Sequence, residues 1–206
     1  MIDRITWLGH ASFRIDGPKT VYIDPWKIRG GASADLILIT HSHYDHLSAE
    51  DVAKIQGPRT VIVATADSAK QLQGDVRVVK PGDRLTLDGV SIEVVSAYNT
   101  NKQFHPRTNN WVGYVVELGG SRIYHPGDTD LIPEMERVRC DIALLPVSGT
   151  YVMTAQEAAQ AANKIKPRFA IPMHYGDIVG SRVDAEKFKE LAACEVRILE
   201  PTDRPP

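Results

Sequence analysis

The chain has 206 residues, of which 24 are basic and 26 are acidic, and its formal net charge is −2 at pH 7. This near balance gives no electrostatic footprint for nucleic acid or for an anionic membrane. No apolar run approaches the roughly 20 residues that a membrane span requires. The length suits a single domain over residues 1–206. The chain lacks a signal-peptide pattern and has two cysteines, which favours the cytoplasm.

Short β-strands are predicted over residues 5–8, 13–15, 20–24 and 35–40, with turn-forming residues between them. The last of these is an apolar run with a β-branched end, as expected for a buried strand. Ser48 is then predicted to cap a helix, and Asp51, three residues later, gives an approximate capping box.

The loop between that strand and that helix contains His41, His43, Asp45 and His46, and so holds three of the seven histidines. Neutral imidazoles and an ionised carboxylate are the ligands that zinc, manganese and ferrous iron prefer. Residues two apart in an extended segment point the same way. His41 and His43 can therefore bind one ion together, while Asp45 and His46 face a second. Ligand sites in α/β proteins favour this place at the carboxyl end of a strand.

The rest of the chain mixes strands with helices. Strands are predicted over residues 60–64, 76–79, 84–87, 90–97, 111–118, 122–125, 141–145, 169–173 and 196–199, and helices over 67–72, 154–166 and 184–193. Thr154 and Glu157 form a capping box at the start of the longest helix. Residues 201–206 are predicted to be a loose tail. This order indicates an α/β fold with two facing sheets and helices outside.

The pattern His-x-His-x-Asp-His after an apolar strand resembles the metallo-β-lactamase superfamily of metal-dependent hydrolases. Further segments match that family in the expected order, namely Tyr22-Ile23-Asp24-Pro25, Tyr124-His125-Pro126-Gly127-Asp128-Thr129 and Ile171-Pro172-Met173-His174-Tyr175-Gly176. The opening Trp7-Leu8-Gly9-His10-Ala11-Ser12-Phe13 is similar to the branch that contains ascorbate-6-phosphate lactonase. The resemblance implies an αββα sandwich of two mixed sheets, with the site at one edge between them.

The resemblance also implies a ligand set for two divalent metal ions, with zinc as the first choice and manganese or iron as alternatives. Asp128 would bridge the ions, His174 would complete the second site, and Asp24 would support a ligand imidazole from behind. His105, on a polar loop, is expected as the third histidine of the first site, with His125 as the alternative. Many family members have that histidine directly at the strand end, where this chain has Asn99, which is therefore expected to contact the substrate.

The implied chemistry is hydrolysis by a hydroxide that spans both ions. Asp45 is expected to orient this hydroxide and to carry its proton. His10 is a second catalytic candidate because its segment lies near the metals in the lactonase branch; the alternative is a buried histidine with a structural role. Tyr151, after a buried strand, is expected to contact the substrate.

The expected substrate is a small molecule, phosphorylated or not, with an ester or lactone bond. A phosphodiester is the main alternative, because the same fold serves phosphodiesterases. A di-iron redox protein and a non-catalytic metal-binding module are alternatives of other classes. Neither nucleic acid nor a membrane is expected as a partner. The oligomeric state stays open, and a homo-oligomer is compatible with the sequence.

Overall fold

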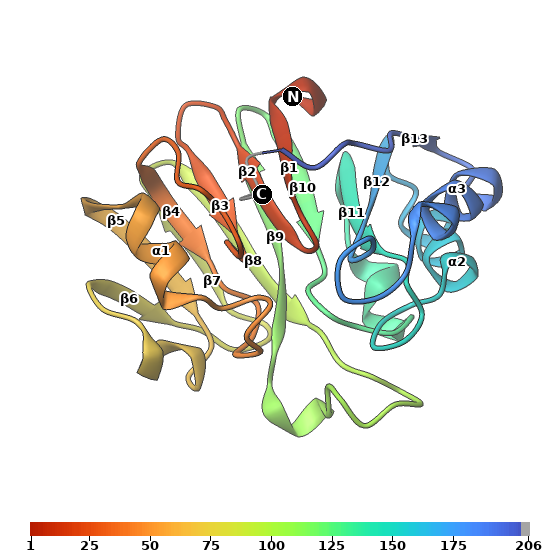
Figure 1. The fold of residues 1–206 in the computed structure, drawn as a ribbon, viewed down its shortest axis with the longest axis horizontal. Coiled ribbons are helices and arrows are strands. Elements are labelled where there is room, and N and C mark those ends of the chain that lie inside the picture. The colour runs from red at the N-terminus through yellow and green to blue at the C-terminus, as the bar shows by residue number, and fades with distance from the viewer. Residues whose placement is uncertain (203–206) are drawn as a thin grey trace.

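Two mixed β-sheets face each other in residues 1–202, the part of the chain that this computed structural model describes (Figure 1). The first sheet contains, in spatial order, β1 (Ile5–Gly9), β2 (Ser12–Ile15), β3 (Val21–Ile23), β4 (Ala34–Leu38), β5 (Gln56–Ala64) and β6 (Asp75–Val78). The second contains β7 (Arg84–Leu87), β8 (Val90–Ser96), β9 (Val112–Leu118), β10 (Ser121–His125), β11 (Ile142–Pro146), β12 (Phe169–Met173) and β13 (Glu195–Val196).

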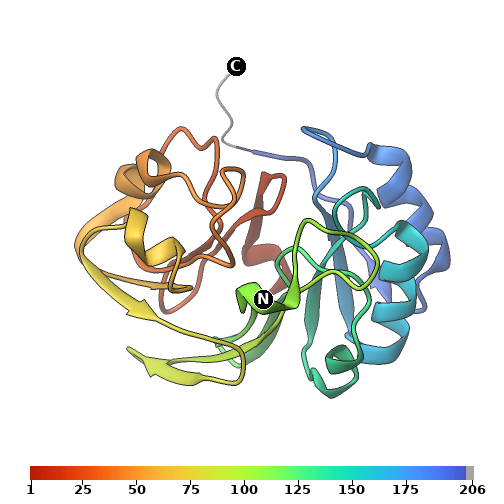
Figure 2. The same cartoon turned by 90° about the horizontal axis from the view of Figure 1, so that it is seen from below.

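Each sheet begins with antiparallel strands and continues with parallel ones. The pairs from β1 to β3 and from β7 to β10 are antiparallel, whereas those from β3 to β6 and from β10 to β13 are parallel. Parallel neighbours need crossover connections, and three of these contain α1 (Ala49–Ile55), α2 (Ala155–Ile165) and α3 (Arg182–Leu191). Figures 1 and 2 show α1 outside the first sheet and α2 and α3 outside the second, which confirms the predicted αββα sandwich.

Alternating side chains of β4 show how the core is layered. Leu36 and Leu38 belong to the cluster that fills the space between the sheets. Ile37 instead belongs to a second cluster with Val52 and Ile55 of α1. Because successive side chains of a strand point to opposite faces, a continuous apolar run covers both faces of the central strands.

The cap of α2 agrees with the sequence prediction, whereas the caps of α1 and α3 differ from it. Thr154 and Glu157 form the expected capping box of α2. Ser48 caps α1 and accepts from Asp51 N at 3.2 Å, but the Asp51 carboxylate accepts from Lys27 N at 2.8 Å and does not complete a box. Helix α3 begins two residues before its expected start, because Ser181 forms a capping box with the residue three positions later.

Other boundaries also differ. Where a helix is predicted over residues 67–72, Ser68–Gln71 form a short 3-10 helix, and the last strand contains two residues. Short 3-10 helices lie at Ile2–Arg4, Ser68–Gln71, Arg107–Asn109 and Pro133–Arg137. None of the helices formed by residues 1–202 has the length and apolar character needed to cross a bilayer.

The predicted loose tail needs a correction at Thr202. Its backbone N–H donates to Trp7 O at 2.9 Å, so the chain is held against β1 as far as this residue. The remainder of the predicted tail, residues 203–206, lies outside the described residues.

Candidate metal centre

All the predicted metal ligands lie on loops that follow β-strands of the two sheets. His41, His43, Asp45 and His46 follow β4, His105 lies between β8 and β9, Asp128 follows β10, and His174 follows β12. These loops converge between the sheets (Figure 1). The structure therefore brings all seven candidates together, although they come from four separate parts of the chain.

Backbone strain is concentrated at this place. Seven non-glycine residues among those described have a positive φ, and three of them belong to the site or its support: His10 at 51°, Asp24 at 45° and His174 at 61°. Each such residue costs on the order of 1–3 kcal/mol and persists only where the surroundings impose it. Strain at these positions is typical of a functional site.

Three histidines form the first ligand cluster. His41 Nε2 lies 3.2 Å from His43 Nδ1, and ligand atoms of His41, His43 and His105 all lie within 4.8 Å of one another. Two imidazole nitrogens bound tetrahedrally at 2.0–2.1 Å would be about 3.3–3.4 Å apart. The nitrogens of His41 and His43 are thus already spaced as ligands of one ion.

A second cluster surrounds the other side of the Asp128 carboxylate. Asp128 Oδ1 lies 3.2 Å from His46 Nε2, and Asp128 Oδ2 lies 3.0 Å from His174 Nε2 and 3.4 Å from His105 Nε2. Asp45 Oδ2 lies 3.8 Å from His46 Nε2. One carboxylate therefore faces both clusters, which is the position of a ligand that bridges two ions.

Gly127 makes this position of Asp128 possible. Its φ is 65°, and a Cβ atom added there would lie 2.7 Å from Val112 O. Only glycine fits this close approach without displacing backbone.

Unsatisfied buried atoms show that the site fits metal ions. His46 Nε2, His105 Nε2 and Asp128 Oδ1 are buried without a hydrogen-bond partner among the described residues. Buried polar atoms are rarely left unpaired, because each costs about 1–3 kcal/mol. All three point into the two clusters. Divalent ions would satisfy them.

The nitrogens of His41 and His46 that face away from the clusters are held by neighbouring groups. The Thr40 hydroxyl donates to Asp24 Oδ2 at 2.5 Å, which leaves its lone pair to accept from His41 Nδ1 at 3.0 Å. Asp24 Oδ2 also lies 2.8 Å from His46 Nδ1. Such partners fix the tautomer and the ring orientation of a ligand. Asp24 thus occupies the supporting position that the family resemblance implies.

His105 is held by Asn99, which gives Asn99 a role other than the predicted substrate contact. Asn99 Oδ1 accepts from both the backbone N and Nδ1 of His105, each at 3.0 Å. Its Nδ2 donates to Tyr151 O at 2.9 Å. Both ends of the amide are used within the protein, and the residue is 8% exposed. Nδ1 of His105 is therefore the protonated nitrogen, and Nε2 is free to bind a metal.

The alternative ligand, His125, uses both of its nitrogens elsewhere. Nε2 lies 2.9 Å from Ala11 O, and Nδ1 accepts from Gly127 N at 3.1 Å. Burial lowers the pKa of His125, which keeps the ring neutral. It packs edge-on against Phe13 and does not belong to either cluster.

These positions separate the two histidines experimentally. We expect His105→Ala and His41→Ala to lower metal affinity to a similar extent, and by more than the roughly 10–100-fold that loss of a supporting partner costs, because both remove a ligand of the first cluster. His125→Gln should leave the metal content of the folded protein unchanged. Calorimetric titration with zinc measures the metal affinity of both variants. Normal affinity in His105→Ala together with lost affinity in His125→Gln would assign the ligand to His125.

His10 contacts the second cluster through Asp45. His10 Nε2 lies 3.0 Å from Asp45 Oδ2, and its ring lies 4.0 Å from the ring of His174. Burial and then the neighbouring charge of His174 lower the pKa of His10 to about 4, so its neutral ring donates to Asp45. Burial would raise the pKa of Asp45, but the hydrogen bond from His10 and the neighbouring charge of His46 together outweigh it and hold that pKa at about 2. Asp45 is therefore ionised at neutral pH.

His46 carries a proton when metal is absent. Burial lowers its pKa, but the Asp128 and Asp24 carboxylates outweigh burial and raise the pKa well above the usual value. A ligand imidazole must be neutral, so a metal ion has to displace this proton. We expect metal affinity to rise with pH from 6 to 8, because proton competition weakens as the pH approaches the raised pKa.

Calorimetry in two buffers of different ionisation enthalpy would measure the protons released. Proton release at pH 7 and stronger binding at pH 8 than at pH 6 are the expected results. An affinity that is constant between pH 6 and 8, without proton release, would mean that His46 is neutral before metal binds.

Trp111 supports the first cluster in a way that the sequence did not indicate. Its ring lies 4.9 Å from that of His41, 4.6 Å from that of His43 and 5.5 Å from that of His105. Its Nε1 donates to Asp67 Oδ2 at 2.8 Å. Ser148, within 3.1 Å of His174 Nδ1, is likewise a partner that the sequence does not reveal. No local motif marks either residue, because their roles depend on loops that are distant in sequence.

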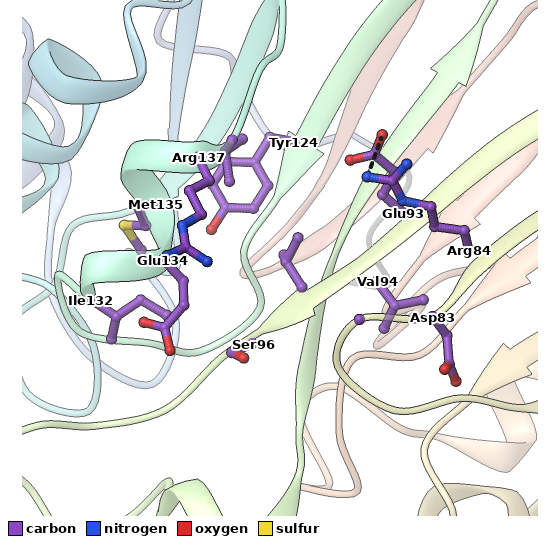
Figure 3. A pocket seen from close by; sticks show the side chains of 13 residues that line it. Asp83, Arg84, Glu93, Val94, Ser96, Tyr124, Ile132, Glu134, Met135 and Arg137 are labelled. Carbon is purple, nitrogen blue, oxygen red and sulfur yellow. Dashed lines mark ion pairs between the residues drawn. The ribbon is translucent and has the colours of Figure 1, made fainter.

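A cavity of about 250 Å³ opens onto both clusters and is lined by His43, Tyr44, Asp45, Phe104, His105, Asp128, Tyr151 and Ile178. Tyr151 thus lies where a substrate contact is predicted. A separate cavity of about 340 Å³ has Tyr124, Ile132 and Met135 on one side and Arg84 and Glu93 on the other (Figure 3). No histidine lines the second cavity, so it has no part in the metal centre.

Comparison with known proteins identifies relatives of the whole chain. Residues 4–174 match the beta-lactamase superfamily domain. A UPF0173 metal-dependent hydrolase from Thermococcus onnurineus is 38% identical, with 96% of both chains covered. The crystal structure of a Parabacteroides distasonis protein assigned as a metal-dependent hydrolase has a TM-score of 0.86 at 36% identity, covering 96% of this chain and 93% of that one. A metallo hydrolase from Ignicoccus hospitalis shares the fold at 24% identity, with a TM-score of 0.77 and coverage of 96% and 94%.

Proposed function

The chain belongs to the beta-lactamase superfamily as a metal-dependent hydrolase, and we propose that it uses two metal ions to cleave an ester or lactone bond in a small molecule. The position of the Asp128 carboxylate is the observation that supports two ions. It faces His46 through one oxygen and both His105 and His174 through the other. A single ion would leave one of these clusters with unsatisfied buried atoms.

The ligand types suit zinc, with manganese or iron as alternatives. Two such ions would activate water at neutral pH and polarise the carbonyl of the substrate. His41, His43 and His105 would hold the first ion, and Asp45, His46 and His174 the second, with Asp128 shared.

Asp45 and His10 would handle the proton. His10 donates to one oxygen of Asp45, which fixes the carboxylate in its ionised form beside the cavity. An ionised carboxylate at this place can orient the attacking water, accept its proton and pass that proton to the leaving oxygen. His10 has no direct access to that oxygen in this arrangement, because its Nε2 is used on Asp45 and its Nδ1 is buried without a partner.

The proposal is tested by a hydrolysis panel of aryl esters, lactones and bis-aryl phosphodiesters, using protein reconstituted separately with zinc, manganese and iron. We expect ester or lactone turnover that is lost with a chelator and restored by metal. Turnover of phosphodiesters alone would favour the phosphodiesterase alternative. Fully metallated protein without any turnover would favour the non-hydrolytic alternatives.

A further inference from the structure

The opening of the metal-centre cavity is apolar. Six large apolar side chains are exposed among residues 1–202, and three of them line this one cavity: Tyr44 at 67%, Phe104 at 50% and Ile178 at 37%. Exposed apolar side chains that gather at one opening mark a binding surface, whereas scattered ones need no explanation.

Two of these side chains, Phe104 and Tyr44, pack against neighbouring aromatic rings. The ring of Phe104 packs edge-on against Tyr151, with 4.6 Å between the ring centres. The Tyr151 carbonyl oxygen accepts a hydrogen bond from the side-chain amide of Asn99, the residue that also orients His105. Tyr44 packs edge-on against the ring of Trp26 at 6.1 Å. Phe104 and Tyr151 are therefore linked, through Asn99, to the first metal cluster.

The same cavity offers no cationic side chain. None of its eight lining residues is lysine or arginine, and its carboxylates, Asp45 and Asp128, are proposed metal ligands. Lys102, on the loop that carries Phe104, is paired with Asp130 at 2.5 Å. A phosphate or carboxylate group on the substrate would find no cationic side chain besides the metal ions, only the hydroxyls of Tyr44 and Tyr151, and would lose part of its hydration beside Phe104 and Ile178.

We propose that the substrate is an uncharged ester or lactone with an apolar acyl or aryl group, which packs against Phe104, Tyr151 and Ile178. The nature of the bond rests on the function proposed above, whereas the apolar group rests on the cavity wall. A cavity of about 250 Å³ limits this group to a short chain or one ring. The lack of lysine and arginine in the lining favours this uncharged group over the phosphorylated substrate that the sequence allows.

A homologous series of para-nitrophenyl esters tests the proposal. From the acetate through the butyrate to the hexanoate, the ratio kcat/KM should rise by about three- to fourfold per methylene until the cavity is full. The hemisuccinate ester has the same chain length as the butyrate but ends in a carboxylate. Its kcat/KM should be at least about tenfold lower than that of the butyrate. Phe104→Ala and Ile178→Ala should flatten the series. The matched control is Leu191→Ala, because Leu191 is 40% exposed on α3 and does not line the cavity.

Binding of hydroxamates separates this proposal from the proposed bond chemistry. Hydroxamates chelate metal ions whatever bond the enzyme cleaves. Calorimetry should show tighter binding of hexanohydroxamate than of acetohydroxamate, and Phe104→Ala should remove the difference. Chain-length dependence without ester or lactone turnover would support the apolar wall and contradict the proposed function. Ester turnover with equal affinity for both hydroxamates, or with a preference for the hemisuccinate, would overturn the apolar substrate.

Discussion

Asp45→Asn should lower kcat on the best ester or lactone by about 10²–10⁴-fold, with a smaller change in KM. Asparagine keeps the size of the side chain, and its carbonyl oxygen can still accept from His10. It removes the negative charge and the proton acceptor, both of which matter most in the transition state. Steady-state kinetics of the reconstituted variant, with its metal content measured in the same sample, gives the result.

Metal content decides how this loss is interpreted, because Asp45 is also a proposed ligand of the second ion. A variant with two ions and a low kcat supports the role in proton transfer. Fully metallated Asp45→Asn with near-normal kcat would contradict that role. Another group would then have to orient the attacking water, and His10 would be the first to test.

Asp128→Ala should reduce bound metal below two ions per chain and lower the stabilisation that metal gives to the wild-type protein. The substitution removes the carboxylate that faces His46, His105 and His174. Binding of an ion to the native state alone raises stability by about 2.7 kcal/mol at 100 times its dissociation constant, so the loss is visible in thermal unfolding.

Elemental analysis after gel filtration and thermal unfolding with and without zinc measure this effect. Asp75→Ala is a suitable control, because Asp75 pairs with Arg77 on β6 and belongs to neither cluster. Two ions per chain in Asp128→Ala, with an unchanged response of the melting temperature to zinc, would contradict the bridging position.

The fold can be predicted where the local chemistry of the sequence agrees with the final structure. The capping box of Thr154 and Glu157 begins α2 as expected. Gly57 and Pro58 disfavour a strand, so the sequence predicts that β5 begins only at residue 60. In the structure β5 begins at Gln56, and its pairing with β4 is interrupted between Ala34 and Leu36, opposite this unfavourable pair. Tertiary contacts with β4 and β6 here outweigh local preference.

Some site residues can be predicted from the sequence, and others depend on how distant loops fold. His41, His43, Asp45 and His46 lie on one short loop, so their chemistry is visible in the sequence itself. The support that Asn99 gives to His105 is not predicted, because it depends on how the following loop folds back: Asn99 N donates to His105 O at 2.7 Å, and its side chain then meets the His105 ring. No sequence pattern encodes that return.

Titration of metal-free protein with zinc, while turnover of the best ester or lactone is followed, tests whether hydrolysis needs two ions held by one shared carboxylate. We expect activity to rise until two equivalents per chain are bound and then to level off, and Asp128→Ala never to reach this level. Full activity at one equivalent, or equal activity without metal, would show that two ions are not needed.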